Sequence, residues 1–297
     1  MLFPLKHLVQ LGSKVVAQVA EQSIIVSQDL CGAGTVSLGA AIPILTALEL
    51  RPRIIPTALL STHTGVPDNT YLDLSNQIGP ILAHWQTLPL AIGGLYLGYL
   101  GPNALTVWQE WLPRWQQLPL RLVDPAMADN GHLYRGLDDH YVAEMRKLIT
   151  HASIVTPNIT EAQLLLGQRP TVGTMTERAV QSLTQRLVTE FHVSVIITGI
   201  TLPGGKTGVA WTGAAAKEPT IWAVDTLPGH YFGTGDIFAS VLAGGLMRGK
   251  CVDDAIRVAM RFVGQAIDAT NRLADPTNPL HDVDFGTLLP ELINDFS

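Results

Sequence analysis

The stretch Gly233-Thr234-Gly235-Asp236 combines residue types that can hold an anion and move a proton, and an apolar run follows it at once. Glycine leaves its backbone N–H group uncovered and tolerates unusual dihedral angles. A helix that begins here would present unpaired N–H donors and the positive end of its dipole, which suits a phosphate in transfer. Asp236 would then be placed to take a proton from an attacking hydroxyl group. The alternative is that Asp236 only caps a helix after a glycine turn.

Two more stretches bear on that choice, residues 124–129 (DPAMAD) and residues 156–161 (TPNITE). In this order and spacing, the three stretches resemble the ribokinase-like small-molecule kinases. Residues 61–65 (STHTG) and 98–101 (GYLG) narrow the resemblance to the pyridoxal (vitamin B6) kinase branch. The resemblance extends from about residue 24 to about residue 270, which is most of the chain.

Phosphoryl transfer needs a positioned nucleophile, a base, neutralisation of phosphate charge and a metal. The resemblance implies ATP and Mg²⁺ as cofactors, with K⁺ or Na⁺ as a candidate monovalent cation. It implies that Asp236 is the general base and that the N–H groups of Gly233, Thr234 and Gly235 bind the phosphoryl group during its transfer. The residues that it implies as cation ligands are Asp124, Asp129, Thr156 and Glu161. The residues that it implies as nucleotide contacts are Asn158, Glu161, Thr198, Thr234 and Tyr134.

Three of these residues also have simpler interpretations. Asp124 precedes Pro125 and is typical of a turn at the end of a strand. Glu161 follows Asn158 by three residues, which is the spacing of a capping box at a helix start. Tyr134 lies in a polar loop, where it is either a cover for the phosphates or a plain surface aromatic residue.

For the second substrate, the resemblance points to one set of positions. They are Ser27, Leu60, His63, Thr64, Tyr99 and Asp236. The loop after residue 27 departs from the pyridoxal kinase pattern, because it lacks the usual Ser-His start and carries Asp29 and Cys31, either of which could touch the substrate. Its Gly32-Ala33-Gly34 is similar to the hydroxymethylpyrimidine kinases of thiamine synthesis. Ala128 also replaces a frequent glycine.

Three functional hypotheses follow. The first is a kinase that converts pyridoxal to pyridoxal 5′-phosphate, with pyridoxine and pyridoxamine as further candidate substrates. The second is a hydroxymethylpyrimidine kinase with the same machinery. The third is a catalytically silent vitamin-binding protein, against which the intact Asp236 and the carboxylate set argue. The resemblance also implies a homodimer.

The bulk composition fits one large domain over residues 1–297, with an amphipathic helical extension at residues 1–20. The net charge is -6 and no Lys/Arg run is present, which argues against a nucleic-acid partner. No apolar run approaches the roughly 20 residues that a membrane helix needs. Cys31 and Cys251 form no disulfide framework, so we expect a soluble protein in a reducing cytoplasm.

Strand-like and helix-like segments alternate along the chain. The expected strands are 23–27, 53–60, 89–97, 119–123, 152–155 and 193–198, with an edge hairpin at 207–211 and 220–224. The expected helices are 37–48, 71–86, 103–115, 138–149, one from 158, one opened by a Thr174–Glu177 capping box and ending near 190, one at Asp236, 252–270 and 287–294. This order predicts an α/β fold, a three-layer αβα sandwich with a mostly parallel sheet. Ligands bind such sheets beyond the carboxyl ends of the strands.

Trp108, Trp111 and Trp115 recur at three- and four-residue spacing in one predicted helix, which indicates core packing or a dimer interface. Two other motifs are incomplete. Gly204-Gly205-Lys206-Thr207 would need glycine at the position of Ile200 to be a P-loop. The nine histidines and two cysteines show no zinc-ligand spacing.

Overall fold

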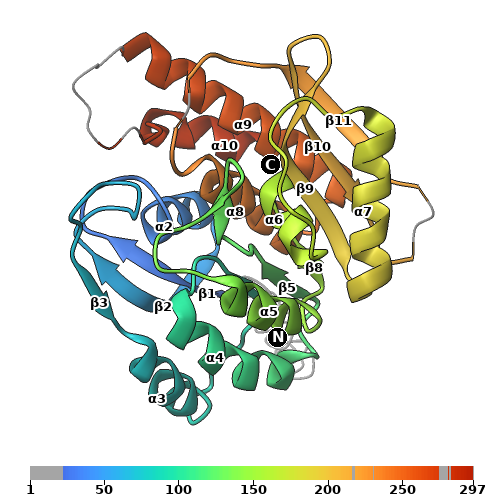
Figure 1. Cartoon of the computed structure of the whole chain (residues 1–297). Coiled ribbons are helices and arrows are strands. Elements are labelled where there is room, and N and C mark those ends of the chain that lie inside the picture. Colours follow the sequence, from blue (N-terminus) through green and yellow to red (C-terminus); the bar gives the residue numbers. More distant parts are fainter. Residues whose placement is uncertain (1–22, 216–217, 230, 274–279, 281, 297) are drawn as a thin grey trace, which may run out of the picture.

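A computed structural model describes residues 23–215, 218–229, 231–273, 280 and 282–296. Their centre is a nine-stranded sheet in the order β11-β10-β9-β8-β5-β4-β1-β2-β3. Helices cover both faces of this sheet (Figure 1). The expected three-layer α/β architecture is therefore confirmed, whereas the extension expected at residues 1–20 lies outside the described residues.

The middle of the sheet is parallel, and its edges are antiparallel. The parallel strands are β1 (Ser23–Cys31), β2 (Arg51–Leu60), β4 (Gly94–Leu97), β5 (Leu120–Val123), β8 (Ile154–Val155) and β9 (Ser194–Leu202). The antiparallel strands are β3 (Tyr71–Asp73), β10 (Lys206–Thr212) and β11 (Thr220–Asp225). The expected hairpin of β10 and β11 thus occupies one edge.

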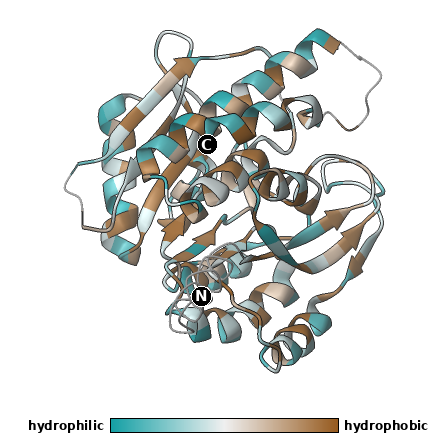
Figure 2. Ribbon diagram, turned by 180° about the vertical axis from the view of Figure 1, so that it is seen from behind, coloured by the Kyte–Doolittle hydropathy of each residue, from teal (hydrophilic) through white to brown (hydrophobic). Residues whose placement is uncertain are grey.

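Each face of the sheet has its own hydrophobic core. One is built with α3 (Ser75–Trp85), α4 (Gly101–Trp111), α5 (Asp139–Ile149), α6 (Ile159–Leu165) and α7 (Glu177–Phe191). The other is built with α2 (Leu38–Ala47), α8 (Thr234–Met247), α9 (Val252–Leu273) and α10 (Leu289–Asp295). The outer helices alternate brown and teal in Figure 2, as expected for elements that bury one side only. Helix α8 differs, because an unbroken run from Ile237 to Gly245 is buried.

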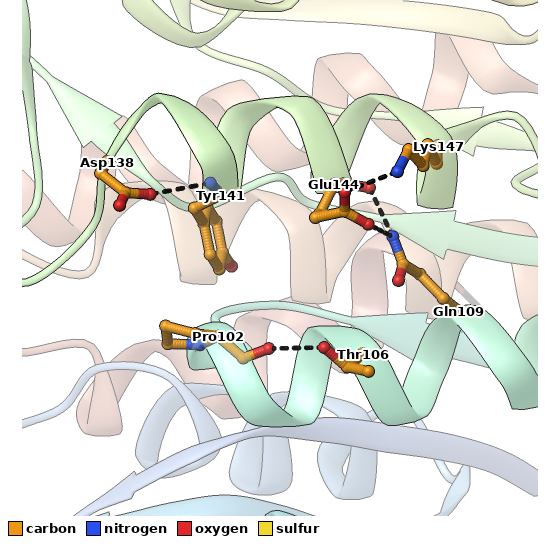
Figure 3. A network of polar contacts seen from close by, with 7 residues as sticks. All are labelled: Pro102, Thr106, Gln109, Asp138, Tyr141, Glu144 and Lys147. Carbon is orange, nitrogen blue, oxygen red and sulfur yellow. Dashed lines mark hydrogen bonds and ion pairs between the residues drawn. The ribbon is translucent and has the colours of Figure 1, made fainter.

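Helices α4 and α5 pack side by side, joined by the polar contacts drawn in Figure 3. Gln109 Nε2 donates to the carbonyl oxygen of Glu144 (2.9 Å) and to its carboxylate (2.8 Å), and Lys147 donates to the same carboxylate. Asp138 caps α5 by accepting from the Tyr141 N–H group. These contacts fix α4, which in turn carries a side chain that reaches β1.

That side chain is Trp108, which is fully buried and donates its indole N–H to Ser27 Oγ at 2.9 Å. Trp111 is also buried, and Trp115 packs against the same core. The packing interpretation of the tryptophan stripe is therefore confirmed. The homodimer stays a prediction, and these inward-facing side chains do not support it.

Several expected boundaries are wrong. Strand β1 continues through Gln28 and Asp29 to Cys31, so Ser27 lies inside a strand; it is level with Leu97, the last residue of β4. Residues 71–73 form the edge strand β3, and α3 begins only at Ser75. The cap of α7 is Thr176 and not Thr174. A small hairpin, β6 (Ala128–Asp129) with β7 (His132–Leu133), stands in the expected loop, and Thr198 lies within β9.

Among the described residues, no helix is both long and apolar enough to cross a bilayer.

Candidate active site

The Gly-Thr-Gly-Asp stretch is the N-terminus of α8, as the sequence predicts. Gly233 is the N-cap residue, with a φ of 87° that side-chain-bearing residues rarely adopt. A Cβ atom there would lie 2.9 Å from the carbonyl oxygen of Thr35. A Cβ atom on Gly235 would meet nothing within 4 Å. The first turn of α8 is therefore open on the side of Gly235, and a helix N-terminus of this kind presents N–H groups that suit an anion.

Asp236 lies in that first turn, and its Oδ2 accepts a hydrogen bond from the backbone N–H of Ser37 at 2.9 Å. Burial raises the pKa of Asp236 to about 7, against the opposing effect of the Ser37 hydrogen bond, and the charge of Asp29 adds to the rise. A carboxylate with a pKa near neutrality is suited to general-base chemistry. Sequence reasoning missed Ser37, because the contact uses its backbone and its φ of 49° follows from tertiary structure.

Asp124 and Glu161 form an acidic rim beside α8. Asp124 follows β5 directly and is buried; desolvation and the charges of Glu161 and Asp236 hold its pKa well above the usual value. The charges of Glu161 and Asp236 therefore both act on Asp124. Within the described part of the chain, no Lys or Arg forms an ion pair with any of them. Such an uncompensated cluster of carboxylates favours a bound cation.

Glu161 is also the structural support of residues 127–129. Its Oε1 accepts from the N–H groups of Met127 (2.9 Å) and Ala128 (3.3 Å), and its Oε2 accepts from that of Asn158 (2.9 Å). The Asn158 side chain accepts in return from the Glu161 N–H, so the capping box is confirmed. Burial raises the pKa of Glu161 to about 8 in spite of these hydrogen bonds.

Replacing Glu161 with glutamine is expected to lower the free energy of unfolding by about 1–3 kcal/mol, because an amide cannot accept from all three backbone groups. The pKa of Glu161 is raised from its usual 4.5 to about 8 in the folded protein. The contribution of its protonated form to the free energy of unfolding is therefore fully present below about pH 4.5 and is lost as the pH rises to about 8. The deficit of the variant should therefore be largest at low pH. Urea unfolding at pH 5 and pH 8.5 measures this difference; an equal deficit at both pH values would contradict it.

The proposed cation ligands only partly converge. The Thr156 hydroxyl is buried beside Asp124 and lowers its pKa. Asp129 accepts from the backbone and side chain of Asn130. Across the described residues, no three acidic, histidine or cysteine side chains gather closely enough to enclose an ion. This arrangement fits Mg²⁺, which usually keeps several waters and binds one or two carboxylates together with substrate phosphates.

The expected nucleotide contacts lie next to this rim. Asn158 and Thr198 face each other in an isolated parallel bridge between α6 and β9, and the Thr198 N–H donates to the carbonyl of Pro157. Tyr134 lies among four acidic residues, because the charges of Glu161, Asp129, Asp236 and Asp124 all add to the rise that burial causes in its pKa. Its phenol therefore lies near the acidic rim.

The expected substrate contacts lie around β1 and β2. Ser27 and Leu60 are fully buried, and Tyr99 is nearly so. His63 is buried against Phe232 (ring centroids 4.2 Å apart); its Nδ1 accepts from the Gly65 N–H, so its Nε2 donates to the Leu280 carbonyl oxygen. Thr64 follows His63 and is half-buried. Tyr99 and His63 offer the flat surfaces that a heteroaromatic ring needs.

A distant segment near the C-terminus holds the loop after β1, and the sequence gives no local signal for it. Asp282 accepts from both the N–H (2.6 Å) and the hydroxyl (3.0 Å) of Thr35, and this hydroxyl also contacts the Val283 carbonyl. Asp282 further forms an isolated bridge with Phe232. One segment thus links the loop of Gly32–Gly34 to the turn that precedes α8.

Replacing Asp282 with alanine is expected to raise the KM for the phosphoryl acceptor several-fold while changing kcat less, because the loop after β1 loses its two hydrogen bonds to Asp282. Asp284→Ala is the matched control, since among the described residues the Asp284 side chain accepts only from the Gly286 N–H group, and its backbone N–H donates to Thr270. Steady-state kinetics on both variants tests this. An equal rise in KM for the two variants would contradict the role given to Asp282.

Comparisons with known proteins identify the family of this chain. Residues 97–281 match the phosphomethylpyrimidine kinase family. The chain belongs to this family. The pyridoxine/pyridoxal/pyridoxamine kinase of Bordetella avium is 30% identical over 255 residues, which cover 82% of this chain and 83% of that protein.

Two solved structures resemble the kinase over nearly its whole length. A putative phosphomethylpyrimidine kinase from Bacteroides thetaiotaomicron, crystallised with pyridoxal, is 32% identical with a TM-score of 0.84, over 91% of this chain and 95% of that one. Pyridoxal kinase from Lactobacillus plantarum is 32% identical with a TM-score of 0.82, over 92% of this chain and 97% of that one. The protein is therefore a vitamin kinase with the ribokinase-like fold, and the resemblance to pyridoxal kinases is confirmed.

Proposed function

We propose that the kinase transfers the γ-phosphoryl group of ATP to the 5′-hydroxymethyl group of pyridoxal, forming pyridoxal 5′-phosphate. Pyridoxine and pyridoxamine, which carry the same hydroxymethyl group, are further substrates of the proposal. The observation that carries it is the placement of Asp236, with its pKa raised to about 7, in the first turn of α8 beside the open space at Gly235. The pyridoxal in the Bacteroides structure supports the choice of substrate.

In the proposed reaction, Asp236 takes the proton of the 5′-hydroxyl group of the substrate. The oxygen of that hydroxyl group attacks the γ-phosphorus in line. The bond from this phosphorus to the β,γ-bridging oxygen breaks, and ADP leaves. The N–H groups of Gly233, Thr234 and Gly235 stabilise the charge on the transferring group. Asp124 would hold Mg²⁺, with Thr156, Asp129 and Glu161 next to it, and Mg²⁺ would supply neutralisation of the phosphate charge. Tyr134 covers this side of the site.

The rest of the site positions the ring. We assign the ring faces to Tyr99 and to the His63–Thr64 segment, beside the apolar wall that Leu60 contributes. The Ser27 hydroxyl oxygen accepts from Trp108, and a hydroxyl group that accepts can also donate its own proton. We assign this proton to a hydrogen bond with the ring nitrogen or with a hydroxyl group on the ring. Because Ser27 is fully buried without a ligand, the neighbouring side chains must move when the ring binds.

Hydroxymethylpyrimidine is the second candidate substrate. The Gly32–Gly34 loop and the family that residues 97–281 match both favour it. A catalytically silent binding protein would need no proton acceptor at the N-terminus of α8, so the Asp236 geometry opposes that alternative.

A side-by-side assay of ADP release with Mg·ATP tests the proposal, with pyridoxal in one reaction and hydroxymethylpyrimidine in the other. We expect faster turnover of pyridoxal and loss of both activities on chelation of Mg²⁺. A strong preference for the pyrimidine would contradict the assignment to pyridoxal. Binding of pyridoxal without any consumption of ATP would contradict the assignment as a kinase of pyridoxal.

The pH dependence of kcat/KM follows from Asp236. The base acts in its ionised form, and its pKa is raised to about 7, so kcat/KM should rise with pH and level off above about 8. A profile measured from pH 5 to pH 9 in a constant-ionic-strength buffer checks this. Activity that stays flat down to pH 5 would contradict a base of this pKa.

A further inference from the structure

Asp29 is a buried carboxylate to which the proposed reaction gives no role. It is only 4% exposed, and the thiol of Cys31 donates to its Oδ2. Among the described residues, no group donates a hydrogen bond to its Oδ1. A buried carboxylate oxygen without a partner is costly, and structures retain such groups mainly where a ligand completes them.

The neighbours of Asp29 are the residues of the substrate half of the site. The charge of Asp29 contributes to the raised pKa values of Asp236, Tyr99 and Cys31, and His63 acts in turn on Asp29. The β1–β2 register shifts between Gln28 and Leu30, so Asp29 lies at an irregularity of the sheet. Irregularities of this kind turn a side chain away from its regular direction and are frequent next to active sites.

Ser37 links the two carboxylates. Its backbone N–H donates to Asp236 Oδ2, and its hydroxyl group lies close enough to Asp29 to oppose the rise that burial causes in the pKa of that carboxyl. A ring whose hydroxymethyl group meets Asp236 therefore has Asp29 within reach of a neighbouring substituent.

We propose that Asp29 is a specificity-determining residue, whose Oδ1 accepts a hydrogen bond from a donor group on the ring carbon next to the one that bears the reacting hydroxymethyl group. This inference rests on the proposed function. At that position pyridoxamine carries an aminomethyl donor, pyridoxine a hydroxymethyl donor and hydroxymethylpyrimidine an amino donor, whereas the aldehyde of pyridoxal only accepts hydrogen bonds. The aminomethyl group of pyridoxamine is a cation, so its hydrogen bond to Asp29 is charge-assisted and is the strongest of these.

The experiment pairs two substrates with two enzymes. Pyridoxamine is compared with the analogue that has a methyl group in place of the aminomethyl group. The two compounds differ in one donor, and neither forms the cyclic hemiacetal that pyridoxal forms. We expect the wild-type kcat/KM for pyridoxamine to exceed that for the methyl analogue by about 10- to 100-fold, the range for a hydrogen bond to a charged group. In Asp29→Asn, which keeps the shape and an acceptor for Cys31, this ratio should fall at least about tenfold.

Cys31→Ala is the matched control, since it removes the thiol contact and keeps the carboxylate. It should leave the ratio within about threefold of the wild-type value. The proposal is overturned by a wild-type ratio near one, by an equal loss for both substrates in Asp29→Asn, or by a Cys31→Ala effect as large as that of Asp29→Asn. If Asp29→Asn does not fold, the proposal is judged on the wild-type ratio of kcat/KM for pyridoxamine to that for the methyl analogue, and a ratio near one overturns it.

Failure of the proposed function has a different outcome from failure of this inference. If the wild-type enzyme phosphorylates only hydroxymethylpyrimidine, the assignment to B6 fails, and the same cycle is run with that pyrimidine and its analogue lacking the amino group. The predicted change in the ratio is the same, and so are the results that would overturn it.

Discussion

Replacing Asp236 with asparagine is expected to lower kcat by about 10²–10⁴-fold, the contribution typical of a positioned general base. Asparagine keeps the shape and an oxygen that can accept from Ser37, so the geometry of the α8 N-terminus should persist. The loss of rate should therefore be accompanied by little change in the binding of pyridoxal. Steady-state kinetics and calorimetric titration of the same preparation measure the two effects.

The same variant should change stability in a direction that depends on pH. The folded-state pKa of Asp236 is raised to about 7, so its contribution to stability is present below about pH 4 and is lost as the pH rises through 7. Asparagine carries no charge, and Asp236→Asn should therefore melt at a higher temperature than the wild type at pH 8. At pH 3.5, where the carboxyl group is largely protonated in both the folded and the unfolded wild type, the two should melt alike, and the difference should grow from there to about pH 7.

Asp139→Asn is the matched control, because Asp139 also lies in the first turn of a helix but is exposed, and its charge is not among those that shift the pKa of Asp124 or Asp236. It should keep the wild-type kcat. Full activity in Asp236→Asn, or an equal loss in both variants, would contradict the assignment of the base.

The two glycines of the anion site are expected to respond differently to alanine. Gly233→Ala places a Cβ 2.9 Å from the Thr35 carbonyl oxygen at a φ of 87°, so it should lower both the free energy of unfolding and the rate. The rate should fall by about 10²–10³-fold, the loss seen when one donor of such a site is misplaced. Stability should fall by about 1–3 kcal/mol because of the strained backbone.

Gly235→Ala should affect only activity. Its Cβ would meet no atom within 4 Å, and alanine is about 1 kcal/mol more favourable than glycine inside a helix. The variant should be at least as stable as the wild type and yet lose activity, because the methyl group enters the space into which the N–H groups of α8 open. Thermal unfolding and kinetics on both variants test this pair. A Gly235→Ala enzyme with full activity would show that the space is not used by the phosphoryl group.

The sequence predicts the layers of the fold and the chemistry of α8, since both depend on local patterns. Apolar runs separated by amphipathic segments are sufficient to predict a parallel sheet with two helical layers. The Asn158–Glu161 spacing is sufficient to predict a capping box, which the structure confirms. The glycine turn before Asp236 likewise predicts a helix start, and α8 begins within that turn, at Thr234.

What the sequence leaves out depends on contacts between distant segments. Ser37 contacts Asp236 through its backbone, and Asp282 holds Thr35 across 247 positions of the chain. The extension of β1 through Asp29 was missed because buried polar residues in a strand look like a loop. Edge strand β3 was missed because three residues are too few to show an alternating pattern.

The most direct test of the central claim is to identify the product of wild-type turnover by ³¹P nuclear magnetic resonance, with Mg·ATP and pyridoxal as the only reactants. We predict a phosphate monoester signal of pyridoxal 5′-phosphate that grows in equal amount with ADP, and no such signal from Asp236→Asn over the same period. Consumption of ATP with release of inorganic phosphate alone, or equal product from the two proteins, would contradict the account.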